Sequence, residues 1–139
     1  MNVNPKKAII LLAIGALIVI SIVLFDAPNG LVTREEAIEV SRNSGLVREG
    51  LAISRSFGVE INYYNSSRLE RLREWHFNEI FENVPRDAFW EEKVPESHSA
   101  WEVIWWFHYQ KKPGGYNVIV IVDAEMAKII HETKGIALG

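Results

Sequence analysis

Hydrophobic and polar positions alternate most clearly between residues 101 and 109. The odd-numbered positions carry only large apolar or aromatic side chains: Trp101, Val103, Trp105, Phe107 and Tyr109. The even-numbered positions are mixed: Glu102, Ile104, Trp106 and His108. Because successive side chains of a strand point to opposite faces, this pattern predicts a β-strand with one apolar and one half-polar face. The segment Lys111–Gly115 follows, and its proline and two glycines predict a hairpin loop.

The segment 117–123, with the sequence NVIVIVD, is apolar on both faces. An antiparallel strand with one solvent-exposed face would alternate apolar and polar residues. Because this segment does not alternate, it is expected at the centre of its sheet. Its second face must then be covered by another part of the chain, by a second copy or by a partner protein. A turn at 123–128 precedes a further apolar pair, Ile129 and Ile130.

Helical patterns precede the hairpin. Thr33 and Glu36 have the spacing of a capping box, which predicts a helix from there to about Ser44 with Gly45 as its stop signal. Apolar residues between 46 and 53 predict a second short helix, which Gly50 weakens. The segment 59–63 alternates and predicts a strand.

A broad apolar stripe predicts a longer helix over residues 67–82. Its apolar side can cover one side of the sheet, while its charged residues form a solvated surface. Residues 83–100 contain two prolines and scattered polar residues, which favours a long loop. Phe89 and Trp90 are expected to hold that loop against the core. Together these elements predict an α+β domain over residues 33–139, with an antiparallel sheet of three to four strands and helices packed on one face.

Residues 8–25 form a run of 18 residues without a charge. As a helix this run would be roughly 27 Å long, close to the thickness of the bilayer's hydrocarbon core. It is longer than the apolar part of a signal peptide and lacks a good cleavage site, so a retained transmembrane anchor is favoured over a cleaved one. Lys6 and Lys7 place residues 1–7 in the cytoplasm. The linker 26–32 and the domain then lie on the extracytoplasmic side of the cell membrane.

Composition narrows the classes of function. The sequence has no cysteine, which excludes disulfides, thiolate metal sites and a cysteine nucleophile. Its net charge is −3, and without Lys6 and Lys7 the 13 remaining basic residues face 18 acidic ones. No basic run is long enough to indicate nucleic-acid binding.

Signatures of catalysis are absent from the sequence. It contains no nucleophile motif, phosphate-binding loop or dinucleotide-binding loop, so we expect no enzyme activity and no cofactor. His76 and Glu79 have the spacing of two ligands on one helix face, and His108 could add a third. A small metal-dependent enzyme built on these residues is therefore one alternative, although no second helical ligand pair supports it.

Asn65 begins the tripeptide Asn-Ser-Ser, which is a sequon for N-glycosylation on an extracytoplasmic face. The same residues also precede a predicted helix. Ser66 or Ser67 would then serve as its N-cap, and this structural role is favoured. The two roles are compatible.

The helix containing EEAIEV, the aromatic strand beginning WEV and the ending VDAEMAKII together resemble the PepSY domain. The resemblance covers residues 33–45 and 101–130. The last turn of that family reads Asp-Ala-x-Thr-Gly-Lys/Glu, whereas this chain has Met126 and Ala127 in place of Thr-Gly. The turn must therefore form without the glycine that most easily takes a positive φ. The resemblance implies a protein that docks onto extracytoplasmic peptidases or modulates them without catalysis.

Four residues are candidates for contact with a partner. Trp106 shares the half-polar strand face with Glu102 and His108, and Trp75 falls off the main stripe of its helix. Trp and Tyr dominate interface hot spots, so an exposed aromatic on such a face would serve a protein partner. The main hypothesis is a membrane-anchored binding or regulatory module that uses the second sheet face or the sheet edge. The alternative is a membrane-tethered homodimer or larger homo-oligomer formed through the apolar sheet face.

Overall fold

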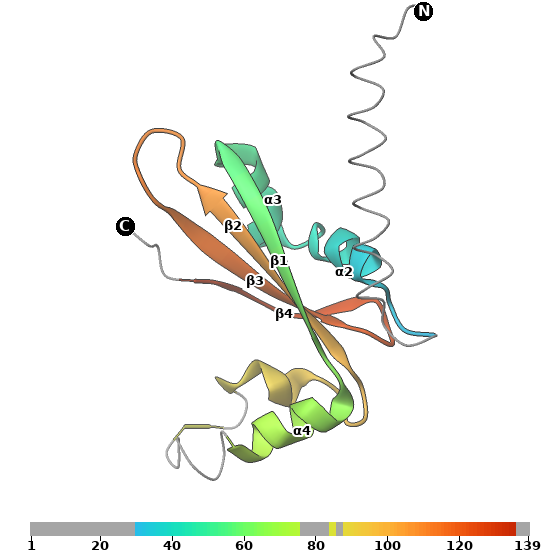
Figure 1. The fold of residues 1–139 in the computed structure, drawn as a ribbon. Coiled ribbons are helices and arrows are strands. Elements are labelled where there is room, and N and C mark those ends of the chain that lie inside the picture. Colours follow the sequence, from blue (N-terminus) through green and yellow to red (C-terminus); the bar gives the residue numbers. More distant parts are fainter. Residues whose placement is uncertain (1–29, 76–83, 86–87, 136–139) are drawn as a thin grey trace, which may run out of the picture.

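The computed structural model describes residues 30–75, 84–85 and 88–135, in which an antiparallel sheet has helices on both faces (Figure 1). The strands are β1 (Ser56–Tyr64), β2 (Ala100–His108), β3 (Gly115–Asp123) and β4 (Lys128–Lys134). They lie side by side in the order β1-β2-β3-β4. The predicted α+β class and the small antiparallel sheet are confirmed. The strand expected at 59–63 is longer, and the apolar pair after the last turn belongs to a fourth strand.

The predicted transmembrane anchor at 8–25 lies outside the described residues. Within the described residues, no helix has the length and apolar character needed to cross a membrane.

The hairpin of β2 and β3 forms the middle of the sheet, and the central position predicted for residues 117–123 from their two apolar faces is confirmed. Its register pairs Trp101 with Val122 and His108 with Gly115. Directly opposed residues project on the same face, so the odd-numbered residues of β2 share a face with the even-numbered residues of β3. On this first face the side chains of Val103, Trp105, Val118 and Val120 are fully buried.

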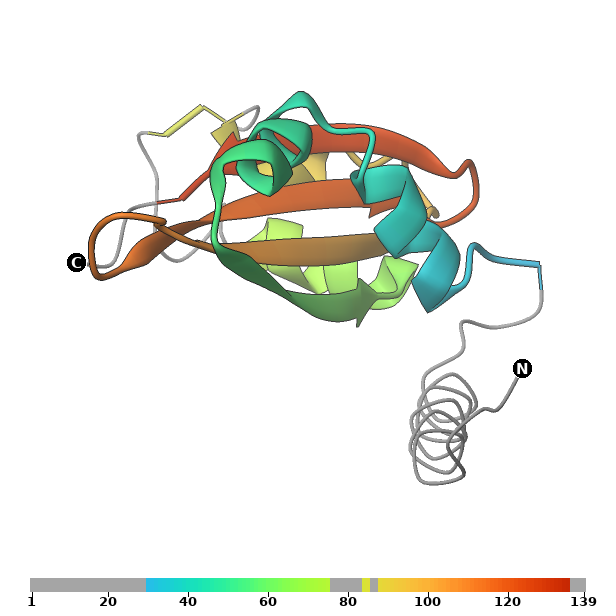
Figure 2. The same ribbon diagram turned by 90° about the horizontal axis from the view of Figure 1, so that it is seen from above.

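Two helices, α2 (Arg34–Ser41) and α3 (Gly45–Ile53), cover this first face (Figure 2). The indole nitrogen of Trp101 donates a hydrogen bond of 2.8 Å to the carbonyl of Val32. That of Trp105 donates one of 3.0 Å to the hydroxyl of Ser41. The expectation that Trp101 and Trp105 belong to the core is therefore confirmed, and both have the polar partner that a buried indole needs.

The helix ends differ in part from the predicted ones. The capping box is confirmed, because the amide of Glu36 donates to Thr33 Oγ1 and the amide of Thr33 donates to the Glu36 carboxylate. The expected end near Ser44 is wrong, because α2 ends at Ser41. Ser44 instead caps α3 by accepting a hydrogen bond from the Val47 amide, and Gly45 is the first residue of α3.

The opposite sheet face is covered at one end by α4 (Ser66–Trp75) and the 3₁₀-helix η3 (Trp90–Lys93). Figure 2 shows α2 and α3 in front of the sheet and α4 behind it. The buried residues of this second cluster are Leu69, Val94, Ala100 and Ile121. Ile121 is thus covered by another part of the same chain, which was one of the three alternatives for this face. The expectation of helices on one face only is wrong.

The segment 83–100, predicted to be a loop, contains η3 and is held by a side chain of α4. The Arg73 guanidinium donates hydrogen bonds to the carbonyls of Glu91 and Val94, with Nη2–O distances of 2.8 and 2.7 Å. Trp90 packs against this second cluster and lies edge-on to the Tyr64 ring at a centroid distance of 5.4 Å. Its expected role in holding the segment is therefore confirmed. Residues 76–82 of the predicted helix lie outside the described residues.

The turn between β3 and β4 takes the positive φ expected of a glycine, although it contains none. Ala127 has a φ of 53°. Asp123 stabilises the turn, because its Oδ1 accepts hydrogen bonds of 2.9 Å from the amides of Glu125 and Met126. The left-handed conformation costs a residue with a Cβ atom about 1–2 kcal/mol. Ala127 therefore carries backbone strain that the surrounding hydrogen bonds compensate.

Replacement of Ala127 by glycine is expected to raise the free energy of unfolding by about 1 kcal/mol, because it removes this strain. Urea unfolding of the full chain in a neutral detergent measures the change. Ala52→Gly on the exposed side of α3 is the matched control, and it should lower the same quantity by about 1 kcal/mol. Destabilisation by both substitutions would contradict the assignment of strain to Ala127.

Candidate functional site

The outer edge of β1 is the most accessible pairing surface of the sheet. β1 pairs with β2 over nine consecutive positions, from Ser56 opposite His108 to Tyr64 opposite Ala100, without a bulge. Within the described part of the chain no strand lies on its other side. An unpaired edge presents a row of backbone donors and acceptors to another extended chain.

The side chains of β1 are compatible with the pairing of a further strand at this edge. Phe57, Val59, Ile61 and Tyr63 project toward the face covered by α2 and α3, since they oppose the odd-numbered residues of β2. Phe57 is 48 % exposed and its ring lies 5.5 Å from that of Trp105. β1 contains no proline, lysine or arginine, which natural edge strands use against pairing, and Glu60 is its one charged residue. We call the four residues the apolar row of β1.

The other edge of the sheet is protected. β4 carries Lys128, Glu132 and Lys134, and its pairing with β3 has an irregularity beside Ile121 and Val122. Charges and bulges of this kind prevent the addition of a further strand. Of the two edges that the described residues form, β1 is therefore the one suited to pairing with another chain.

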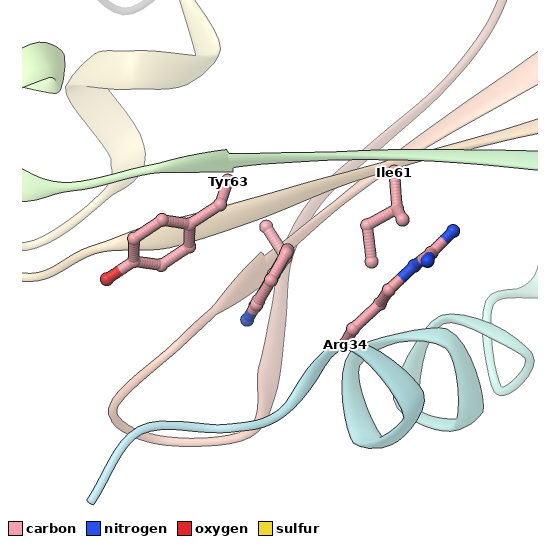
Figure 3. A pocket seen from close by; sticks show the side chains of 4 residues that line it. Arg34, Ile61 and Tyr63 are labelled. Atoms are coloured by element: carbon pink, nitrogen blue, oxygen red, sulfur yellow. The ribbon is translucent and has the colours of Figure 1, made fainter. Parts of the chain in front are cut away.

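A pocket of about 160 Å³ opens between β1 and α2 (Figure 3). It is lined by Arg34, Ile61, Tyr63 and Trp101. The Tyr63 and Trp101 rings lie 4.8 Å apart between centroids, and Arg34 extends from the first turn of α2 toward Ile61. The pocket thus combines an aromatic and aliphatic wall with one guanidinium group. Such a wall can hold the apolar stem of a side chain whose carboxylate meets Arg34.

Three of the four residues predicted to contact a partner share the second sheet face. Glu102 is held within the fold, because its Oε2 accepts hydrogen bonds from Asn62 Nδ2 at 3.0 Å and the Tyr64 hydroxyl at 3.2 Å. Burial, and then the negative charge of Glu102, raise the pKa of Tyr64 above its ordinary value. Trp106 is half-buried and His108 exposed, and both line a cavity at the hairpin.

The fourth residue, Trp75, stands apart from this group. It is the last described residue of α4 and is 46 % exposed, as its position off the helical stripe predicted. The structure therefore brings Trp106 and His108 together. It assigns Glu102 a role inside the fold and places Trp75 on a different element.

The sequence did not single out Arg34 or Phe57. Arg34 is indistinguishable from other surface cations before α2 is placed beside β1. Phe57 lies outside the predicted strand 59–63. The sequence does contain a signal for a longer strand: the apolar residue at 57 continues the alternation of 59, 61 and 63 with the same period of two.

A histidine and two carboxylates gather where β2 begins and β3 ends. His98 Nδ1 lies 2.7 Å from Asp123 Oδ2 and 4.0 Å from Glu125 Oε2. The hydrogen bond to Asp123 raises the pKa of His98 above its ordinary value. Ligand atoms of all three residues lie within 4.8 Å of one another, which is a spacing a metal ion could use.

Both carboxylates of this group already accept backbone hydrogen bonds. Each Glu125 oxygen accepts from the Ser99 amide, at 3.0 and 2.8 Å, and Asp123 holds the following turn. The group therefore joins the start of β2 to the β3–β4 turn. The metal ligands considered from the sequence were different: His76 and Glu79 lie outside the described residues, and His108 is not part of this group.

Asn65 is the N-cap of α4. Its Oδ1 accepts a hydrogen bond of 2.8 Å from the Arg68 amide, so the expectation that Ser66 or Ser67 caps the helix is wrong. Asn65 is also exposed, and its use as a glycosylation site stays a prediction.

Comparison with known proteins returns no match: no protein-family model, curated protein or solved structure matches this chain.

Proposed function

We propose that this protein is a membrane-anchored, extracytoplasmic and non-catalytic binding module that accepts an extended segment of a partner protein along β1. The observation that carries the proposal is the regular edge of β1, which lacks proline, lysine and arginine, beside the pocket at Arg34. Strand addition of this kind obtains affinity from main-chain hydrogen bonds and specificity from pockets for alternate side chains.

The pocket defines the chemistry of the partner segment. Side chains of an added strand that project toward α2 would lie along the apolar row of β1. One of them would enter the pocket lined by Ile61, Tyr63 and Trp101. A carboxylate at its end would complement Arg34, because a guanidinium binds a carboxylate through charge-assisted hydrogen bonds. The segment we propose is therefore extended, alternately apolar, and carries one acidic residue.

The anchor at 8–25 would hold this module at the extracytoplasmic surface of the cell membrane. The resemblance to the PepSY domain adds the proposal that the partner is an extracytoplasmic peptidase or another envelope protein whose activity the module modulates. In this proposal the chain contributes docking and needs no cofactor.

The proposal is tested by capture with the full chain, solubilised in a neutral detergent, from membrane and secreted proteins of the native host. Phe57→Lys and Arg34→Gln are each expected to lower recovery of the partner about tenfold, a loss typical of an interface anchor. Met126→Lys is the matched control: Met126 is 60 % exposed in the β3–β4 turn, and its replacement should leave recovery unchanged.

Two results would argue against the proposal. Recovery of the chain's own copies alone, reduced by Phe57→Lys, would show a homo-oligomer formed by pairing of two β1 strands. Equal recovery by Phe57→Lys, Arg34→Gln and Met126→Lys would show that the β1 edge is not the docking surface.

A further inference from the structure

The hairpin end of the sheet carries a concentration of positive charge around a cavity. The cavity has a volume of about 350 Å³, and its lining includes Arg55, His108, Lys111 and Lys112 but no acidic residue. The Arg55 amide donates a hydrogen bond of 3.0 Å to the His108 carbonyl, which fixes the start of β1 beside the end of β2. Lys112 Nζ lies 4.4 Å from the centroid of the Tyr109 ring. Three permanent cations thus surround one concave site.

These cations have no carboxylate partner within the described residues. Neither Arg55, Lys111 nor Lys112 forms an ion pair with any residue that the structure describes, whereas Arg42 lies 3.2 Å from Glu39. The chain as a whole has a net charge of −3, so their grouping is a local property of this end. Like charges around a cavity repel one another, and a bound anion would relieve that repulsion.

An apolar cavity of about 170 Å³ adjoins the basic one and shares His108 and Gly114 with it. Trp106 lines it from the second sheet face, whereas Phe107 and Tyr116 also line it but project toward the first face. An apolar cavity beside a cationic one suits a ligand that joins an anionic group to an apolar one.

We infer that the two cavities form one binding site for a phosphate ester with an apolar or aromatic substituent. The guanidinium of Arg55 and the ammonium groups of Lys111 and Lys112 suit the charge and the oxygen acceptors of a phosphate group. The apolar cavity beside Trp106 accommodates the substituent. This site is separate from the proposed docking edge of β1, and neither Phe57 nor Arg34 lines it.

The test uses the full chain in a neutral detergent and calorimetric titration with phenyl phosphate, inorganic phosphate and phenol. Phenyl phosphate should bind about tenfold more tightly than either of its parts, because it occupies both cavities. The double variant Lys111→Gln/Lys112→Gln should weaken its binding at least about tenfold. Arg48→Gln/Lys128→Gln removes the same charge from exposed positions on α3 and β4, and it should change binding less than about twofold.

Vesicles with and without phosphatidic acid separate two sources of the phosphate group. Binding to phosphatidic acid vesicles that the hairpin double variant loses would identify a lipid phosphate. Binding of phenyl phosphate without binding to vesicles would identify a soluble ester. Equal weakening by the two double variants, or no binding of phenyl phosphate, would overturn the inference. If the Phe57→Lys variant fails to capture the partner protein but still binds phenyl phosphate, the loss is at the β1 edge and leaves the phosphate site unaffected.

Discussion

Replacement of Trp105 by alanine is expected to lower the free energy of unfolding by about 3–5 kcal/mol. Trp105 is fully buried, and its ring lies 6.2 Å from Phe107 and 5.5 Å from Phe57 between centroids. The substitution also leaves the Ser41 hydroxyl without the indole N–H that donates to it at 3.0 Å. A domain of this size has a total stability of about 5–15 kcal/mol, so the variant should be largely unfolded under mild denaturing conditions.

Urea unfolding of the full chain in neutral detergent measures this effect, followed by near-ultraviolet circular dichroism. Trp75→Ala removes the same side chain from a position that is 46 % exposed, and it should change stability by less than about 1 kcal/mol. Similar losses in both variants would contradict the placement of Trp105 at the centre of the core.

Replacement of Gly50 by alanine is expected to destabilise the domain by about 1–3 kcal/mol, although alanine is the better helix former. A Cβ atom at Gly50 would lie 2.4 Å from Cε2 of Phe107, whose side chain is 1 % exposed and has little room to move. The glycine that weakens the predicted helix is thus the residue that lets α3 approach β2 closely.

Gly45→Ala is the matched control, because a Cβ at Gly45 meets no atom within 4 Å. It should leave stability unchanged or raise it by up to about 1 kcal/mol. The combination of Gly50→Ala with Phe107→Leu should recover part of the loss, since it removes the ring atoms that clash. Stabilisation by both glycine substitutions would show that α3 does not pack closely on Phe107.

Local patterns predicted the elements of this fold well, because they depend on neighbouring residues. The period-two alternation of 101–109 identified β2 and assigned Trp101 and Trp105 to the core. The capping box at Thr33 located the start of α2. The end of α2 was misplaced because Gly45 is a common stop signal, whereas here Ser44 caps the next helix.

The arrangement of these elements depends on contacts between distant residues, which no local pattern contains. Alternation alone does not show that Leu69 reaches Ile121 and places α4 on the second face. The candidate site was missed for the same reason: Arg34 and Ile61 are 27 positions apart in the sequence and meet only when α2 packs beside β1. Trp106 and His108 were identified as a pair because both lie on one strand face, where the period of two holds.

The segment before α2 is hydrogen-bonded to one end of the sheet. The Val32 amide donates a hydrogen bond of 2.7 Å to the carbonyl of Ala124, and Trp101 donates to the carbonyl of Val32. The β2–β3 hairpin lies at the opposite end, roughly 30 Å away along strands of nine residues. With the proposed anchor, the point of attachment fixes which end of the domain is nearer to the bilayer. The His98 group would lie close to the lipid surface, and the basic hairpin would stand farthest above it, within reach of molecules approaching from outside.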